Sequence, residues 1–174
     1  LATMILGGIM AFASLGLIEG LLRFIPQYRG KNNDKIAYLF SLSNKILLAT
    51  SIFFAVVLFF LSEFIAVTIF HNVELTLLLK IISFFLPIAV LANPLLAAIR
   101  GYEFISSYSF IYNILQNIVR VVALGILVLI GLHTSSTIIS FCLGFLTVLI
   151  ASYLVCKKKA PELFIKSKLA KRDK

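Results

Sequence analysis

Long apolar stretches recur along the chain, separated by short polar connectors. A helix needs about 20 predominantly apolar residues to cross the roughly 30 Å hydrocarbon core of a bilayer. Hydrophobic residues make up 61% of the 174 residues and charged residues 13%, whereas soluble domains have roughly 45–50% and 25%. A soluble core of this size cannot hide so much apolar surface. We therefore predict an all-α integral membrane protein with no separate soluble domain.

The apolar stretches predict five transmembrane helices and a basic tail. Pro26 and Gly30 are expected to end the first helix, and a polar connector over residues 27–44 follows, part of it as a short helix on the membrane surface. Pro87 and Pro94 invite a kink in the third helix, which serves either as a hinge or only to shape the packing. The predicted spans cover residues 1–22, 46–65, 77–99, 109–130 and 137–156, and the cytoplasmic tail covers residues 157–174.

The positive charges predict how these spans are oriented. The net charge is +9, and the basic connectors over residues 23–45, 100–103 and 157–174 alternate with connectors around His71 and His133 that carry few positive charges. Basic connectors are retained in the cytoplasm, so we expect the first span to run inward across the cell membrane. Because the cations flank spans rather than covering a folded surface interleaved with aromatics, we expect membrane lipids, and no nucleic acid, as their partners.

Residue types that hold cofactors or perform catalysis are sparse. His71 and Glu74 are too few for a metal site, and Cys142 and Cys156 form no CxxC pair. We predict no cofactor and no enzymatic activity. Leu1 begins directly in an apolar run without a charged leader, so no signal peptide is predicted, and we expect the chain to be part of a longer protein.

A polar stripe crosses the fourth predicted span. Asn113, Gln116, Asn117 and Arg120 have offsets of i, i+3, i+4 and i+7, which place them on one helical face. In a helix over residues 109–130, Arg120 lies about 16 Å along the axis, near the midplane. An arginine there costs about 2.5–3.5 kcal/mol, so we expect it to face protein or a wet cavity. It either lines a path for a polar, anionic solute or pairs with another helix for structure alone.

Three stretches resemble one family. Residues 16–17 with 20–30, residues 86–87 with 97–102, and residues 113–120 are similar to the prokaryotic polysaccharide flippases, the O-antigen type transporters of the multidrug/oligosaccharidyl-lipid/polysaccharide exporter superfamily. The resemblance covers nearly the whole chain, with diffuse motifs. It implies a transporter of twelve to fourteen helices in two bundles. The five spans would then be helices two to six of the amino-terminal bundle, with residues 157–174 leading to the second bundle.

The resemblance also implies a cargo and a set of binding residues. The cargo is a polyprenyl-pyrophosphate-linked oligosaccharide, which alternating access moves from the inner to the outer leaflet. Arg120 is expected to meet the pyrophosphate, because a guanidinium can donate two parallel hydrogen bonds to phosphate. Arg23 and Arg100 are weaker candidates near the cytoplasmic mouth. Asn113, Gln116 and Asn117 are expected to bond sugar or pyrophosphate oxygens.

Other functions remain open at this point. A multidrug exporter of the same superfamily would need buried acids for organic cations, yet the glutamates fall at span ends or in connectors. A membrane-embedded enzyme would need clustered acids or a nucleophile–base pair at one membrane face. Both histidines fall on the opposite face from the larger polar loops, and no cytoplasmic connector except the tail carries two nearby acids. A non-transporting scaffold subunit would have no use for a polar stripe at mid-depth.

Overall fold

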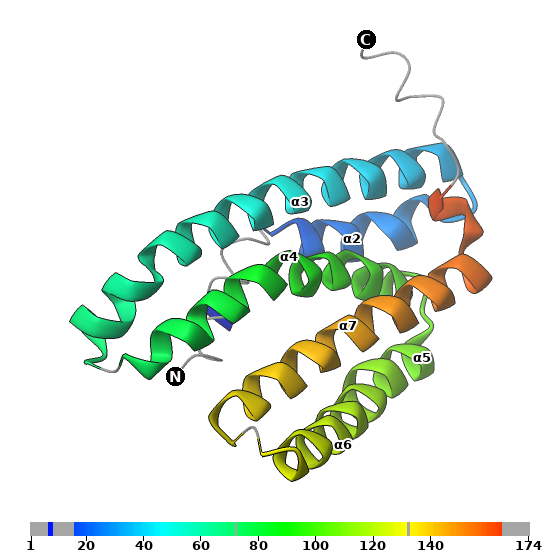
Figure 1. Cartoon of the computed structure of the whole chain (residues 1–174). Helices are drawn as coiled ribbons and strands as arrows, with labels where there is room; N and C mark the ends of the chain where they lie inside the picture. Colours follow the sequence, from blue (N-terminus) through cyan, green and yellow to red (C-terminus); the bar gives the residue numbers. More distant parts are fainter. Residues whose placement is uncertain (1–6, 9–15, 72, 132, 165–174) are drawn as a thin grey trace.

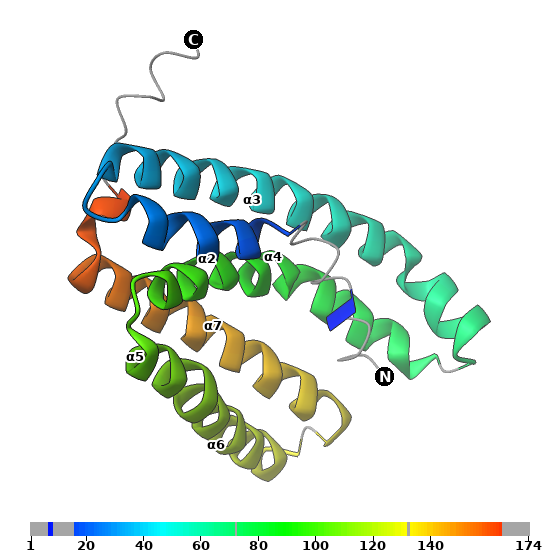
Figure 2. The ribbon, with the colours of Figure 1, turned by 180° about the vertical axis from the view of Figure 1, so that it is seen from behind.

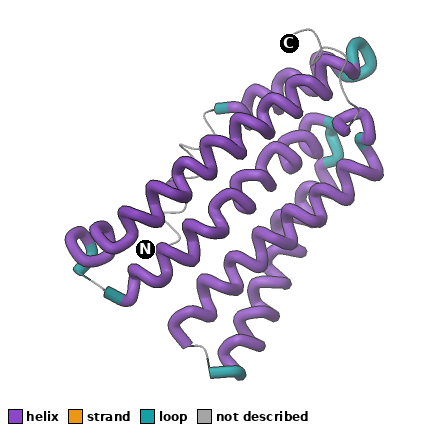
Figure 3. The backbone as a smooth tube through the Cα atoms, turned by 45° about the horizontal axis from the view of Figure 1, so that its top comes forward, coloured by secondary structure: helices purple, strands orange, loops and turns teal. Residues whose placement is uncertain are grey.

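The protein consists of long helices joined by short loops. A computed structural model describes residues 7–8, 16–71, 73–131 and 133–164, and no strand occurs among them (Figure 3). Four helical stretches are long and apolar enough to cross a membrane: Asn33–Thr68, Leu75–Gly101, Ile105–Leu129 and Ser136–Lys159. The all-helical fold predicted from the sequence is therefore confirmed for the described part of the chain, and these four helices are compatible with a membrane protein. The predicted fifth span is not confirmed.

The long helices form a row. Helix α3 (Asn33–Phe64) packs on α4 (Glu74–Gly101), α4 packs on α7 (His133–Lys159), and α7 packs on α6 (Gln116–Leu129) (Figure 1). The shorter α2 (Leu17–Tyr28) lies against α4 and α3, as the reverse view shows (Figure 2). Within the most apolar stretch of each span, 44% of residues are buried in the span that contains α4 but only 11% in the one that contains α6. Helix α4 is thus central and α6 is an edge.

The first predicted span lies mostly outside the described residues. Of residues 1–22, the structure describes Gly7 and Gly8, which are helical, and residues 16–22. Helix α2 has 12 residues, too few to cross a bilayer alone. Pro26 lies inside α2, so the prediction that it helps to end the helix is wrong. The end comes at Tyr28, and Gly30 follows with a φ of 76°.

Part of the predicted connector over residues 27–44 was expected to be a short separate helix, but the structure makes residues from Asn33 onward one continuous helix with the second predicted span. The side chain of Asn32 accepts a hydrogen bond from the backbone N–H of Lys35 at 3.2 Å and caps the helix. Asp34 in the first turn favours the positive end of the helix dipole. Buried Ile36 and Phe40 then fix this turn in the core it shares with α2 and α4. The second span is accordingly a helix of 32 residues.

Helix α4 continues through both prolines that were expected to kink it. Pro87 and Pro94 lie inside one helix of 28 residues, which bends along its length in Figure 1. Small buried residues such as Ala92, Ala97 and Ala98 let the neighbouring helices approach closely. The bent helix α4 is therefore closely packed against its neighbours around the prolines.

The last span is longer at both ends than predicted. Helix α7 starts at His133 and includes Lys157, Lys158 and Lys159, which were expected to begin the tail. A short 3₁₀ helix, Pro161–Phe164, then buries Leu163 in the same core as Ile36. The rest of the predicted tail, residues 165–174, lies outside the described residues. The first part of the tail is thus folded onto the bundle.

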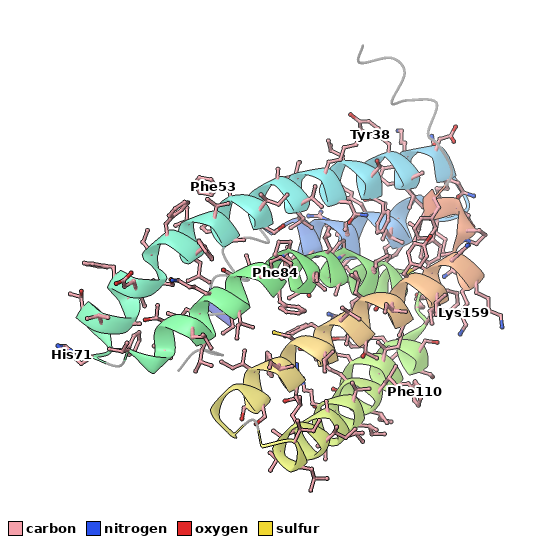
Figure 4. The ribbon with its side chains drawn as sticks, viewed as in Figure 1. Tyr38, Phe53, His71, Phe84, Phe110 and Lys159 are labelled. Atoms are coloured by element: carbon pink, nitrogen blue, oxygen red, sulfur yellow. The ribbon has the colours of Figure 1, made fainter. Side chains whose placement is uncertain are left out.

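The basic connectors gather at one end of the bundle, as the alternating pattern requires. The ends of α2, α4 and α7 and the start of α3 meet there, with Lys159 at that end and His71 at the other in Figure 4. Arg29 donates to the carbonyl oxygen of Tyr102 at 3.1 Å and lies 3.8 Å from the Glu103 carboxylate. Lys159 donates to Ser107 Oγ at 2.9 Å. This basic end is the one that the sequence assigns to the cytoplasm.

Several serines are buried between the helices, and their hydroxyls bond within their own helix. Each donates to a backbone carbonyl three or four residues earlier, which satisfies the hydroxyl without a neighbouring helix. Close helix contacts at these positions rest on the small size of serine rather than on interhelical hydrogen bonds. These residues are Ser51, Ser62, Ser83, Ser140 and Ser152.

Candidate polar site between α6 and α7

The polar stripe lies on a continuous helical rod. Helix α5 (Ile105–Ser109), a π-helical segment (Phe110–Leu115) and α6 follow one another without a break. At 1.5 Å per residue, Arg120 lies about 22 Å from Ile105 and about 13 Å from Leu129. The rod begins earlier than the predicted residue 109, yet Arg120 remains deep within the span.

The stripe begins in the π-helical segment, which contains Asn113, and continues on α6, which contains the other three polar residues. Asn113 and Asn117 are exposed, with Asn113 Nδ2 donating to Ser109 Oγ at 3.3 Å and Asn117 Nδ2 donating to the Asn113 carbonyl at 2.7 Å. Gln116 is buried, with 3% of its surface exposed. A π turn holds more residues than an α turn, so a side chain's direction departs from the simple α-helical offset. The four polar residues therefore adjoin one another but do not share one environment.

Gln116 links Arg120 to the preceding turn of the helix. With its amide oriented to satisfy both neighbours, Gln116 Nε2 donates to the Tyr112 carbonyl at 3.0 Å and its Oε1 accepts from an Arg120 Nη at 2.6 Å. This is a charge-assisted hydrogen bond, which is stronger than one between neutral groups. Gln116 thus holds the guanidinium against α7 and does not itself face the exposed side of α6.

Arg120 lies in a notch that Gly144 creates on α7. A Cβ added to Gly144 would be 2.7 Å from Arg120 Cγ and 2.8 Å from Arg120 Nε, closer than any side chain tolerates. The guanidinium carbon lies 3.9 Å from the centroid of the Phe141 ring and 5.3 Å from that of Phe145. Such cation–π contacts contribute about 2 kcal/mol or more when they are desolvated. The notch therefore shields part of the side chain from lipid.

The charge of Arg120 has no acidic partner among the residues that the structure describes. The single ion pair found there joins Arg29 and Glu103 at the basic end of the bundle. Arg120 Nε is buried and makes no hydrogen bond, which costs free energy. Aromatic faces and one amide oxygen thus stabilise the cation without neutralising it. An anion that reached this site would meet an uncompensated positive charge.

The other two predicted arginines lie elsewhere. Arg100, at the last turn of α4, is exposed and has its guanidinium carbon 5.1 Å from the Tyr108 ring centroid. Arg23 is exposed on α2. Neither α2 nor α4 is a principal neighbour of α6. The structure therefore brings Gln116 and Arg120 together, sets Asn113 and Asn117 beside them, and leaves Arg23 and Arg100 apart.

Three residues of α7 that complete this site were not predicted. Phe141, Gly144 and Phe145 form the surface on which Arg120 lies. A glycine between two phenylalanines in an otherwise bulky span is the sequence signal that could have pointed to the notch. Which helix faces it cannot be read from one segment, because the pairing depends on tertiary packing.

The candidate site contains none of the residue groupings that hold metals. Among the described residues, no group of three or more histidines, cysteines or acids could hold a metal ion. Cys142 and Cys156 are buried thiols without a disulfide. The chain matches no family model, and no curated protein and no solved structure is significantly similar to it.

Proposed function

We propose that this chain forms part of a cell-membrane flippase that moves polyprenyl-pyrophosphate-linked oligosaccharide across the bilayer by alternating access, for polysaccharide export. The exposed side of α6 lines the polar path, and a second helical bundle of the same protein covers it. The resemblance of residues 16–30, 86–102 and 113–120 to polysaccharide flippases supports this proposal. The proposal assigns the chain no chemical step and no cofactor.

One observation supports the proposal above all others: Arg120 is a deep cation without an acidic partner. A charge at this depth costs about 2.5–3.5 kcal/mol on insertion scales, and the aromatic notch offsets part of that cost. A pyrophosphate carries the opposite charge and several acceptor oxygens, and a guanidinium can bind two of them at once. Exposed Asn113 and Asn117 lie beside Arg120 and offer amide groups to the sugar.

The described acids argue against a multidrug exporter. Such a transporter would need a buried carboxylate to attract an organic cation. Asp34, Glu19, Glu63 and Glu103 are all exposed, and Glu162 is half-buried beside the basic end. Within the described residues, the deep charge is therefore positive, which favours an anionic cargo.

The test is transport by the intact protein reconstituted in vesicles with a lipid-linked oligosaccharide. Arg120→Gln should abolish movement of the lipid between leaflets. Arg120→Lys should retain part of this movement, because lysine keeps the positive charge but lacks the planar guanidinium that donates two parallel hydrogen bonds. Lys45→Gln removes one exposed positive charge from α3 and is the matched control. A normal transport rate for Arg120→Gln, in protein that inserts and folds normally, would show that Arg120 serves packing alone.

A further inference from the structure

A second cation lies within a span, in the half of the bundle opposite the basic end. Lys80 is exposed on α4, six residues after the helix begins at Glu74, and therefore about 9 Å along it. Its Nζ lies 5.8 Å from the centroid of the Phe59 ring on α3. Side chains on a helix lean toward its amino terminus. Lys80 is near enough to the start of α4 for its flexible stem to carry the ammonium group to the membrane surface at the α3–α4 turn.

Two shallow, open depressions lie beside Lys80, one on each side of Phe84. The first has a volume of about 360 Å³, and its lining is Leu77, Lys80, Ile81, Phe84 and Phe85. The second has a volume of about 230 Å³, and its lining is Ala55, Val56, Phe59, Phe60, Ser83 and Phe84. The Ser83 hydroxyl donates to the Lys80 carbonyl at 2.7 Å, so it presents no unsatisfied donor. Together the depressions form an apolar surface with a single cation.

Phe84, labelled in Figure 4, belongs to the linings of both depressions. It is 76% exposed, and Phe60 on the neighbouring helix is 74% exposed. Rings this exposed contribute little to the fold. The apolar linings of the two depressions suit hydrocarbon chains.

Lys80 also has no ion-pair partner in the part of the chain whose side chains are described. Among the side chains that the structure describes, no carboxylate lies within 4 Å of its ammonium group. A lysine in a span extends its amine to the headgroup level while its stem stays in the apolar region. The group that it meets there carries phosphate, and basic groups at this level attract anionic lipid headgroups.

We propose that this face binds an anionic phospholipid from the leaflet around the α3–α4 turn. The phosphate pairs with the Lys80 ammonium group, and an acyl chain lies in the depressions beside Phe84. Binding at this face does not depend on the transport proposed for α6, because Lys80 and Arg120 belong to different helices that are not principal neighbours.

The test measures lipid binding to the delipidated, intact protein by native mass spectrometry, with phosphatidylglycerol and phosphatidylcholine as probes. Lys80→Gln should weaken phosphatidylglycerol binding about fivefold, which is the effect of one lysine near an anionic surface, and should change phosphatidylcholine binding less. Lys45→Gln removes an exposed lysine from α3 as the matched control. Equal weakening by both variants, or none by Lys80→Gln, would overturn the proposal.

A second variant and a soluble competitor test the acyl chain. Phe84→Ala should weaken the binding of both lipids, because it removes the wall between the depressions. It should leave folding intact, because Phe84 is mostly exposed. Glycerol 3-phosphate should not displace the lipid. Unchanged binding to Phe84→Ala, or full displacement by glycerol 3-phosphate, would show that the depressions hold no acyl chain.

Discussion

The glycine notch predicts an energetic coupling between α6 and α7 that can be measured directly. In Gly144→Ala, the new Cβ would lie 2.7 Å from Arg120 Cγ, an atom near the base of the side chain that cannot move without a change of rotamer. Overpacking of this kind costs about 1–3 kcal/mol. Alanine in a helix gains back about 1 kcal/mol relative to glycine. We expect Gly144→Ala to destabilise the protein by about 0–2 kcal/mol.

The sign reverses when Arg120 is shortened. Arg120→Ala removes the atoms that the new methyl group would meet, so Gly144→Ala should then stabilise the protein by about 1 kcal/mol. The difference between the two backgrounds is a coupling free energy of about 1–3 kcal/mol. Gly125→Ala on α6 is the control, because no atom lies within 4 Å of its added Cβ.

The assay is unfolding of detergent-solubilised protein by titration with a denaturing detergent. The chain has no tryptophan, so far-ultraviolet circular dichroism is the readout of helix content. All four members of the cycle, with the Gly125→Ala control, are measured under the same conditions. If Gly144→Ala has the same effect with and without Arg120, to within about 0.5 kcal/mol, the side chain does not occupy the notch and the packing described for the site is incorrect.

Three further substitutions at the basic end have expected outcomes in the same assay. Glu103→Gly should leave stability unchanged or raise it by about 1 kcal/mol, because Glu103 adopts a φ of 63° and its exposed pair with Arg29 is weak; a clear loss would mean that the pair matters. Gly101→Ala should cost about 1–3 kcal/mol, since the new Cβ would lie 2.9 Å from Ile25 Cβ, and an effect no larger than that of an open glycine would contradict this contact. Burial raises the pKa of Tyr102 to about 12, above the unfolded value of about 10, so its contribution to stability is complete below pH 10 and is lost as the pH rises to 12. Tyr102→Phe should reduce that loss and remove a phenol that ionises near pH 12 in an absorbance titration. Stability at neutral pH should not fall, because the hydroxyl is buried without a partner.

The spans were predictable because hydrophobicity decides where a helix can cross a bilayer. The residues at which the helices begin and end were harder to predict. The sequence around Asn32 and Asp34 contains polar residues that suit a loop, but the same residues cap a helix, and buried Ile36 and Phe40 decide between the two. Pro26 was expected to help end a helix that in fact continues to Tyr28. Local composition does not reveal which of two compatible conformations the tertiary contacts stabilise.

Only those residues of the candidate site that belong to the rod containing α6 were predictable from the sequence. The helical offsets along this rod pointed to Arg120 and to the polar residues around it, and their depth was evident from the length of the span. The π-helical segment that contains Asn113 has no signal in the sequence. The partners Phe141 and Gly144 belong to another helix, so nothing in the stripe identifies them.

The buried serines have a consequence for how the chain enters the membrane during synthesis. Because each of these five hydroxyls bonds within its own helix, none of them needs a later helix to satisfy it. Helix α6 differs, since the aromatic faces that shelter Arg120 come from α7. We expect the translocon to release α6 and α7 together as a hairpin.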